Sequence, residues 1–140
     1  MNHSSTEQLN HYFTSIYYFL HYPHQDGITH QAVRLLQHIE KRENVTIGDL
    51  AKLLAVSHNT ASEHVKRLIQ NGLVSKERSR EDERRVYVRI TEKGQEVLKL
   101  HTQLDDGKLV QILERLPDEK REKVLQGFAI LAEEAKRCFS

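Results

Sequence analysis

The chain has little of what covalent bracing, tight turns or membrane insertion requires. Its 140 residues include one cysteine, Cys138, two prolines and six glycines. A single cysteine cannot form an internal disulfide, and so few prolines and glycines do not supply the many turns of a β-sandwich or β-barrel. No uninterrupted apolar run approaches the roughly 18 residues of a transmembrane helix. These absences favour a soluble, mostly helical chain of one domain's size.

Two functional classes also lack their usual signals. Residues 1–10 hold no basic stretch followed by an apolar core, which argues against secretion, so we expect a cytoplasmic protein. The polar residues do not converge by spacing on a nucleophile with a base, a paired carboxylate site or a phosphate loop. We therefore expect neither an enzyme nor a bound cofactor.

The net charge of +1 is unevenly distributed along the chain. Residues 45–94 carry ten Lys/Arg against seven Asp/Glu, whereas residues 1–44 carry three against four and residues 95–140 carry eight against nine. The middle third is therefore the basic one, and a polyanionic partner should meet the chain there.

The sequence predicts four helices before residue 73. Apolar residues at three- and four-residue spacings predict a first helix over Thr6–Tyr22. Thr29 is placed to cap a second helix, and Thr46, followed three residues later by an aspartate, is placed to cap a third. Ser57 is a suitable N-cap for a fourth helix, and Gly72 is suited to the left-handed stop that ends it.

The pattern then changes from helical to alternating. It predicts two short strands, Leu73–Ser79 and Arg85–Ile90, joined by the charged loop 80–84. One long helix is expected from Thr91 to about Leu116, and Pro117 should begin the last one. Helix, tight turn, helix and hairpin in this order predict a mostly α fold with a small β wing, a winged helix-turn-helix.

Residues 45–94, VTIGDLAKLLAVSHNTASEHVKRLIQNGLVSKERSREDERRVYVRITEKG, resemble the MarR family of bacterial transcription regulators. The most specific matches lie in the wing, where Asp82 and Arg84 fit the family's D-x-R pattern, and at its end, where Ile90, Thr91 and Gly94 fit the family's L-T-x-x-G ending. The resemblance implies a DNA-binding lobe at 45–94, flanked by dimerisation helices at 1–44 and 95–140. It also implies a homodimer that binds a palindromic DNA operator, acting as a ligand-responsive repressor.

The fourth helix is the candidate recognition helix. In a helix-turn-helix, the solvent-facing side chains near the N-terminus of the second helix reach base edges in the major groove, and cations nearer its far end hold phosphates. Asn59 is suited to adenine, and Thr60 to a thymine methyl or a phosphate. The predicted DNA contacts on this helix are Ser57, His58, Asn59, Thr60, Ser62, Glu63, Lys66 and Arg67.

The wing carries more cations than a free-standing hairpin of its length needs. These are Lys76, Arg78, Arg80, Arg84 and Arg85. The family resemblance implies that Arg84 enters the minor groove while Asp82 orients it, and a guanidinium suits the narrow groove of A·T-rich DNA. The alternative is a solvated tip in which aspartate and arginine pair with each other and meet no partner.

The terminal helices predict a dimer and suggest an effector site. The first helix is apolar over more than one narrow stripe, and a single copy would leave much of it and of the last helix exposed. A pocket lined by Tyr12, Tyr17, Tyr18 and Phe19, with His38 nearby, would suit an aromatic or phenolic effector. The alternative for these aromatic side chains is an ordinary core.

Two other hypotheses remain open. A zinc-responsive regulator would use the N-terminal histidines His11, His21, His24, His30 and His38, with Glu40 or Asp26 completing the site, but no cysteine ligand is near and we do not predict a metal. Redox control is not favoured, because Cys138 lies away from the first helix. In the second hypothesis the winged helix contacts proteins, and the chain would then be a monomer that ignores duplex DNA.

Overall fold

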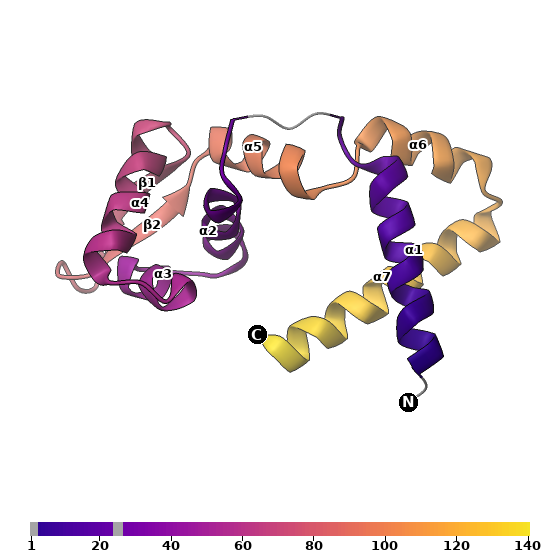
Figure 1. The fold of residues 1–140 in the computed structure, drawn as a ribbon, viewed down its shortest axis with the longest axis horizontal. Coiled ribbons are helices and arrows are strands. Elements are labelled where there is room, and N and C mark those ends of the chain that lie inside the picture. Colours follow the sequence, from indigo (N-terminus) through magenta and orange to yellow (C-terminus); the bar gives the residue numbers. More distant parts are fainter. Residues whose placement is uncertain (1–2, 24–26) are drawn as a thin grey trace. The chain divides into compact units, whose positions relative to one another are not determined.

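The computed structural model describes residues 3–23 and 27–140. As predicted, the described chain is mostly helical with one antiparallel two-stranded hairpin (Figure 1). The elements follow in the order α1 (His3–Leu20), α2 (His30–Lys41), α3 (Ile47–Leu54), α4 (His58–Gln70), β1 (Val74–Arg78), β2 (Val86–Ile90), α5 (Glu92–Thr102), α6 (Asp106–Arg115) and α7 (Asp118–Phe139).

These elements form two compact units. The winged-helix unit is the described part of Tyr22–Gln103, and the terminal unit is the described part up to His21 together with Leu104–Ser140. The winged-helix unit is larger than the lobe expected at 45–94. The reason is packing: α2 and the part of α5 that lies beyond residue 94 contribute side chains to the same core.

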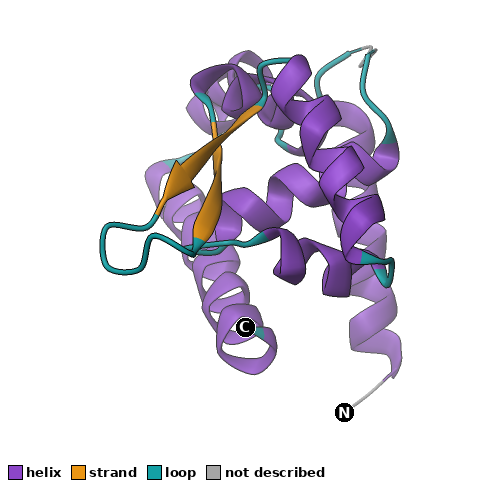
Figure 2. Ribbon diagram, turned by 90° about the vertical axis from the view of Figure 1, so that its left-hand side faces the viewer, coloured by secondary structure: helices purple, strands orange, loops and turns teal. Residues whose placement is uncertain are grey.

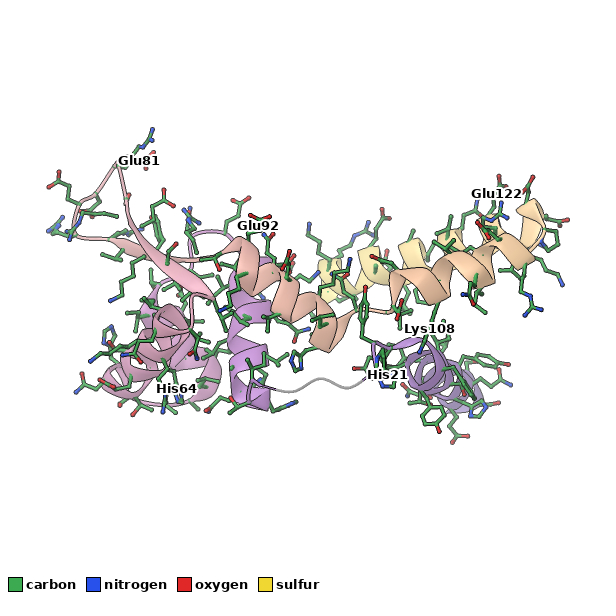
Figure 3. All side chains as sticks on the ribbon, turned by 90° about the horizontal axis from the view of Figure 1, so that it is seen from above. His21, His64, Glu81, Glu92, Lys108 and Glu122 are labelled. Atoms are coloured by element: carbon green, nitrogen blue, oxygen red, sulfur yellow. The ribbon has the colours of Figure 1, made fainter. Side chains whose placement is uncertain are left out.

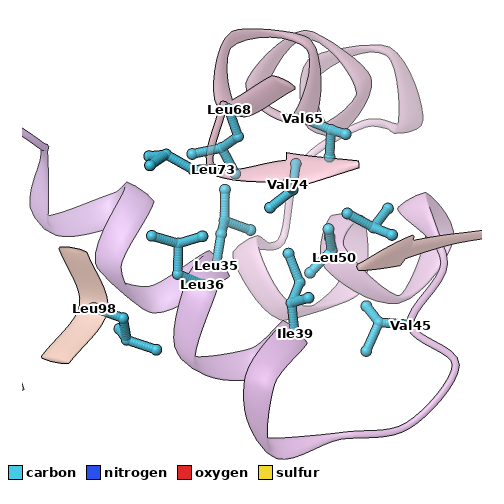
Figure 4. Close-up of a cluster of buried hydrophobic side chains, with 11 residues drawn as sticks. Leu35, Leu36, Ile39, Val45, Leu50, Val65, Leu68, Leu73, Val74 and Leu98 are labelled. Atoms are coloured by element: carbon cyan, nitrogen blue, oxygen red, sulfur yellow. The ribbon is translucent and has the colours of Figure 1, made fainter. Parts of the chain in front are cut away.

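The core of the winged-helix unit is formed by aliphatic side chains from every one of its described elements (Figure 4). Leu35 and Leu36 of α2 are fully buried against Leu50 of α3, Val65 of α4 and Val88 of β2. The remaining buried members are Ile39, Val45, Leu68, Leu73, Val74 and Leu98. This shared core fixes α3, α4 and the hairpin relative to one another, which is what a composite binding surface requires.

The helix starts of this unit are set by the predicted caps. The Thr29 hydroxyl accepts a hydrogen bond from the Ala32 N–H at 3.1 Å. Thr46 and Asp49 form a reciprocal capping box, with distances of 3.1 Å and 2.9 Å. The Ser57 hydroxyl accepts from the Thr60 N–H at 3.1 Å, so α4 begins where the sequence predicts.

A tight corner joins the end of α4 to the start of α5. The Thr91 hydroxyl donates to the Gly72 carbonyl at 2.6 Å and accepts from the Gly94 N–H at 3.0 Å. Lys93 Nζ donates to the Asn71 carbonyl at 3.0 Å. Gly72 has the predicted left-handed backbone, with φ of 75°. Thr91 and Gly94, the two fixed residues of the T-x-x-G pattern, thus attach the start of α5 to the turn after α4.

The long helix predicted from Thr91 to about Leu116 is wrong, because the chain breaks between α5 and α6. The Asp105 carboxylate caps α6 by accepting from the Gly107 and Lys108 N–H groups at 2.9 Å and 3.4 Å. The Asp105 N–H donates to the Leu20 carbonyl at 2.7 Å, and Leu104 pairs with His21 as an isolated bridge. Contacts with the end of α1 therefore replace continued helix.

The terminal unit contains α1, α6 and α7 and has no buried side chain among its described residues. Lys108 Nζ donates to the His21 carbonyl at 3.3 Å, and both residues are labelled in Figure 3. Arg121 of α7 holds the corner after α6 by donating to the carbonyls of Leu113 and Leu116 at 2.9 Å and 3.0 Å. In the described chain, no helix combines the length and apolarity needed to cross a bilayer.

Candidate nucleic-acid interface

The predicted recognition helix presents one buried face and one polar face. α3 ends at Ala55, whose left-handed backbone with φ of 54° turns the chain toward α4. On α4, the side chains of Ala61, Val65 and Leu68 are buried. The polar side chains predicted to contact DNA are exposed, apart from the half-buried Ser62: they are Ser57, His58, Asn59, Thr60, Glu63, Lys66 and Arg67.

Three of these side chains, those of Ser57, Thr60 and Arg67, already have partners on α4 or at its N-cap. Ser57 is occupied by the cap, and its hydroxyl also donates to the Thr60 hydroxyl at 3.0 Å. Arg67 Nη2 lies 2.8 Å from His64 Nδ1. Since a guanidinium only donates, that nitrogen of His64 accepts and carries no proton. Sequence reasoning missed His64, although its three-residue spacing from Arg67 on a helix was a usable signal.

The tip of the hairpin is braced by its own side chains. Asp82 Oδ1 accepts from the Arg84 backbone N–H at 3.1 Å and from Arg84 Nε at 3.2 Å. Ser79 Oγ accepts from the N–H groups of Glu81 and Asp82, and Arg78 Nη1 donates to the Glu83 carbonyl at 2.8 Å. The tip loop extends beyond the strands in Figure 2. The predicted pairing of Asp82 with Arg84 is therefore present, and the Arg84 side chain is still 92% exposed.

A basic groove lies between the starts of α3 and α4 and the hairpin. It is lined by Lys76, Arg78, Arg84 and Arg85 together with His58, and the N-terminal residues of α3, Thr46 to Gly48, form part of its wall. Among the described residues that line it, none is acidic. Cations gathered around a groove of this kind produce a positive local potential that attracts a polyanion. Arg80 does not line the groove, and Lys66 and Arg67 lie further along α4.

The predicted effector pocket is not assembled within either unit. Tyr12, Tyr17, Tyr18 and Phe19 are all exposed on α1, whereas His38 lies on α2. In the winged-helix unit, His38 lines a shallow pocket with Arg42 and Asp49. Burial, and then the Arg42 charge, lower the pKa of His38. The aromatic effector site therefore stays a prediction.

The described residues hold no group of three or more histidine, cysteine or acidic side chains placed to bind a metal ion. Of the histidines considered for zinc, His24 lies outside the described residues, as does Asp26. His21 is engaged with the end of α1, where Nδ1 lies 2.7 Å from the Tyr17 carbonyl and the ring stacks on Tyr17 with centroids 5.1 Å apart.

A helix-turn-helix and a basic wing on one core define a winged helix-turn-helix protein. The family model described as transcriptional regulator SarA/Rot matches residues 18–101. The chain belongs to this family of transcriptional regulators, and its fold is the winged helix also seen in the MarR family.

Individual relatives agree with this assignment. The chain is 25% identical over 103 residues to the uncharacterized HTH-type transcriptional regulator YdgJ of Bacillus subtilis, covering 74% of this chain and 63% of that one. The chain thus spans less than two thirds of the length of this curated relative. It is 30% identical to the transcriptional regulator Tm0710 of Thermotoga maritima, with a TM-score of 0.59 over 81% of this chain and 80% of the other.

Two more distant structures share the fold. The zinc-responsive MarR family member ZitR of Lactococcus lactis is 22% identical, with a TM-score of 0.51 over 92% of this chain and 97% of its own. A point mutant of S. aureus MepR, solved bound to an oligodeoxyribonucleotide, is 20% identical, with a TM-score of 0.52 over 76% and 79% of the two chains.

Proposed function

We propose that the chain acts in the cytoplasm as a homodimeric repressor that binds a palindromic DNA operator and releases it in response to a small effector. Its role is recognition, without catalysis. The observation that carries the proposal is the basic groove, because it joins the hairpin to the start of α4 with four cations and no acidic side chain among the described residues that line it.

The two elements suit different grooves of one duplex. The first turn of α4 exposes His58, Asn59 and Thr60, which are the kinds of side chain that read base edges in the major groove. Arg84 is braced by Asp82 and almost fully exposed, so its guanidinium is oriented for a narrow minor groove before DNA arrives. Lys76, Arg78 and Arg85 are assigned to the phosphates between these two contacts.

The terminal unit supports dimerisation. It leaves large apolar side chains exposed on two helices, including Tyr12, Phe13 and Tyr18 on α1 and Leu131 and Phe139 on α7. A stripe of this length on a soluble chain usually meets another surface. A second copy is the occupant that doubles the DNA contact, because two-fold symmetry places two recognition helices about 34 Å apart, one turn of DNA.

Selection of bound duplexes from a random pool tests the proposal. A palindromic consensus is expected, and the affinity for it should fall steeply as salt concentration rises. Arg84→Ala should weaken binding about tenfold, whereas Arg34→Ala, which removes the same charge from an exposed position on α2 outside the groove, should not. A monomer with no affinity for any duplex would contradict the proposal and favour a protein-binding role.

The same duplex tests the effector. Aromatic and phenolic acids and Zn²⁺ are added separately to the protein–DNA complex, and release of DNA is followed by fluorescence anisotropy. Release by an aromatic compound that is lost in Tyr12→Ala supports the site on α1. Release by Zn²⁺ alone would instead favour a metal-responsive regulator.

A further inference from the structure

One arginine of the wing is bonded differently from the others. Arg89, on β2, donates from Nε to Glu77 Oε2 at 2.8 Å and from Nη2 to Asn44 Oδ1 at 2.9 Å. Its guanidinium carbon also lies 5.2 Å from the centre of the Tyr87 ring. The Arg89 side chain is 37% exposed, compared with 92% for Arg84. Much of its hydrogen-bonding capacity is therefore directed at the protein, not at solvent.

The two partners of Arg89 lie on different segments. Glu77 is on β1, whereas Asn44 lies in the loop between α2 and α3 and has a left-handed backbone with φ of 55°. The next residue of that loop, Val45, is buried and accepts a hydrogen bond from the Val88 N–H at 2.8 Å. The hairpin is thus attached to the entry of α3 by a backbone bond on its inner side and by Arg89 through side chains.

A small tilt of the hairpin at this attachment moves the tip, and with it Arg84, by a larger distance. Arg89 is next to Ile90, which pairs with Val74 at the base of the hairpin, and Arg84 lies five residues further toward the tip. At no more than about 3.3 Å per residue, Arg84 is up to about 16 Å from the attachment, so a tilt of about 10° displaces it by up to about 3 Å. A displacement of that size removes a guanidinium from hydrogen-bonding range.

We propose that Arg89 is a positioning residue: with Glu77 and Asn44 it fixes the angle at which the wing meets the duplex, and it does not itself contact DNA. The inference rests on the proposed function. Removing an acidic side chain near bound DNA normally strengthens DNA binding. Our proposal predicts the opposite for Glu77, because loss of its carboxylate frees the hairpin and so weakens DNA binding.

The experiment compares Glu77→Ala with Glu81→Ala, which removes the same charge from the exposed tip of the same hairpin (Figure 3). For the selected duplex, Glu77→Ala and Arg89→Ala should each weaken binding about two- to fivefold, the range of an exposed ion pair. Glu81→Ala should leave binding unchanged or tighten it. In the Arg89→Ala background, Glu77→Ala should not weaken binding further, because the hydrogen bonds of Arg89 to Glu77 and Asn44 are already lost.

Two further readouts separate positioning from contact. Arg89→Ala and Glu77→Ala should change the slope of log Kd against log salt equally, because each releases the same hairpin, whereas a phosphate contact made by Arg89 itself would lower the slope by about 0.9 in Arg89→Ala alone. In the DNA-free chain, amide exchange at Val88 should accelerate in Glu77→Ala and Arg89→Ala but not in Glu81→Ala.

Three results would overturn the inference: tighter binding by Glu77→Ala, a salt slope lowered in Arg89→Ala but not in Glu77→Ala, or unchanged exchange at Val88. A wild-type chain that binds no duplex would overturn the proposed function instead. Amide exchange would then still decide whether Arg89 holds the hairpin to the loop.

Discussion

Replacing Gly94 by alanine should destabilise the winged-helix unit, although alanine is the better helix former. Gly94 lies in the first turn of α5, and a Cβ built on it would lie 2.1 Å from the Leu73 carbonyl oxygen and 2.8 Å from Ile90 Cγ1. The first neighbour is backbone, so no side-chain rotation relieves the overlap. The Leu73 carbonyl must move by roughly 1.4 Å to reach an ordinary contact distance of about 3.5 Å.

The loss of unfolding free energy can be estimated from the contacts of the Leu73 carbonyl. It accepts a hydrogen bond from the Thr91 N–H at 3.0 Å, worth about 1 kcal/mol, and Leu73 itself is buried in the core. Overpacking of a well-packed site adds about 1–3 kcal/mol. Better helix propensity returns about 1 kcal/mol. We therefore expect Gly94→Ala to lower the free energy of unfolding by about 1–3 kcal/mol.

Urea unfolding followed by circular dichroism, at one fixed protein concentration, measures this change. Gly48→Ala is the matched control, because its added Cβ would meet only Thr46 Oγ1, at 3.6 Å. That variant should be unchanged or stabilised by up to about 1 kcal/mol. If Gly94→Ala were as stable as Gly48→Ala, the close approach of α5 to the turn after α4 would be refuted.

Three other perturbations give distinct outcomes. Leu36→Ala removes a fully buried side chain and should cost about 2–5 kcal/mol of unfolding free energy by urea titration, and a smaller loss would mean a loosely packed core. Phe128→Glu, on the exposed apolar face of α7, should shift the dimer to monomer in sedimentation analysis with helicity retained, and an unchanged dimer would remove α7 from the interface. The Thr46 backbone N–H lowers the pKa of Asp49 below its ordinary value of 3.8, so the stability that this carboxylate contributes is present above that pH and is lost as pH falls below it. Asp49→Asn should therefore flatten the loss of stability in acid, and an unaltered pH profile would contradict this assignment.

The features predicted well from the sequence are those decided by neighbouring residues. The caps at Thr29, Thr46 and Ser57 each need only a hydroxyl and an N–H three residues later. The hairpin lies within one residue of the predicted strand ends, because the alternation of Val86, Val88 and Ile90 marks it locally. The pairing of Asp82 with Arg84 was likewise a short-range inference.

The features that were missed depend on partners far away in the chain. Helical periodicity continues through 91–116. The local cap at Asp105 starts a new helix there, but the bond from Asp105 to Leu20 and the pairing of Leu104 with His21 that accompany the break join distant parts of the chain. The contact of Arg89 with Asn44 joins residues 45 positions apart and has no local pattern. The extent of the winged-helix unit was also unpredictable locally, because it follows from the packing of α2 and α5 on the core.

A hydroxyl-radical footprint on the selected duplex tests the central claim most directly, with the wild-type chain and Arg84→Ala compared at saturating protein. We expect two symmetric protected segments about 34 Å apart, each flanked by a protected minor-groove site that Arg84→Ala selectively loses. A single asymmetric patch, or a pattern that Arg84→Ala leaves unchanged, would contradict binding by paired copies of α4 and the wing.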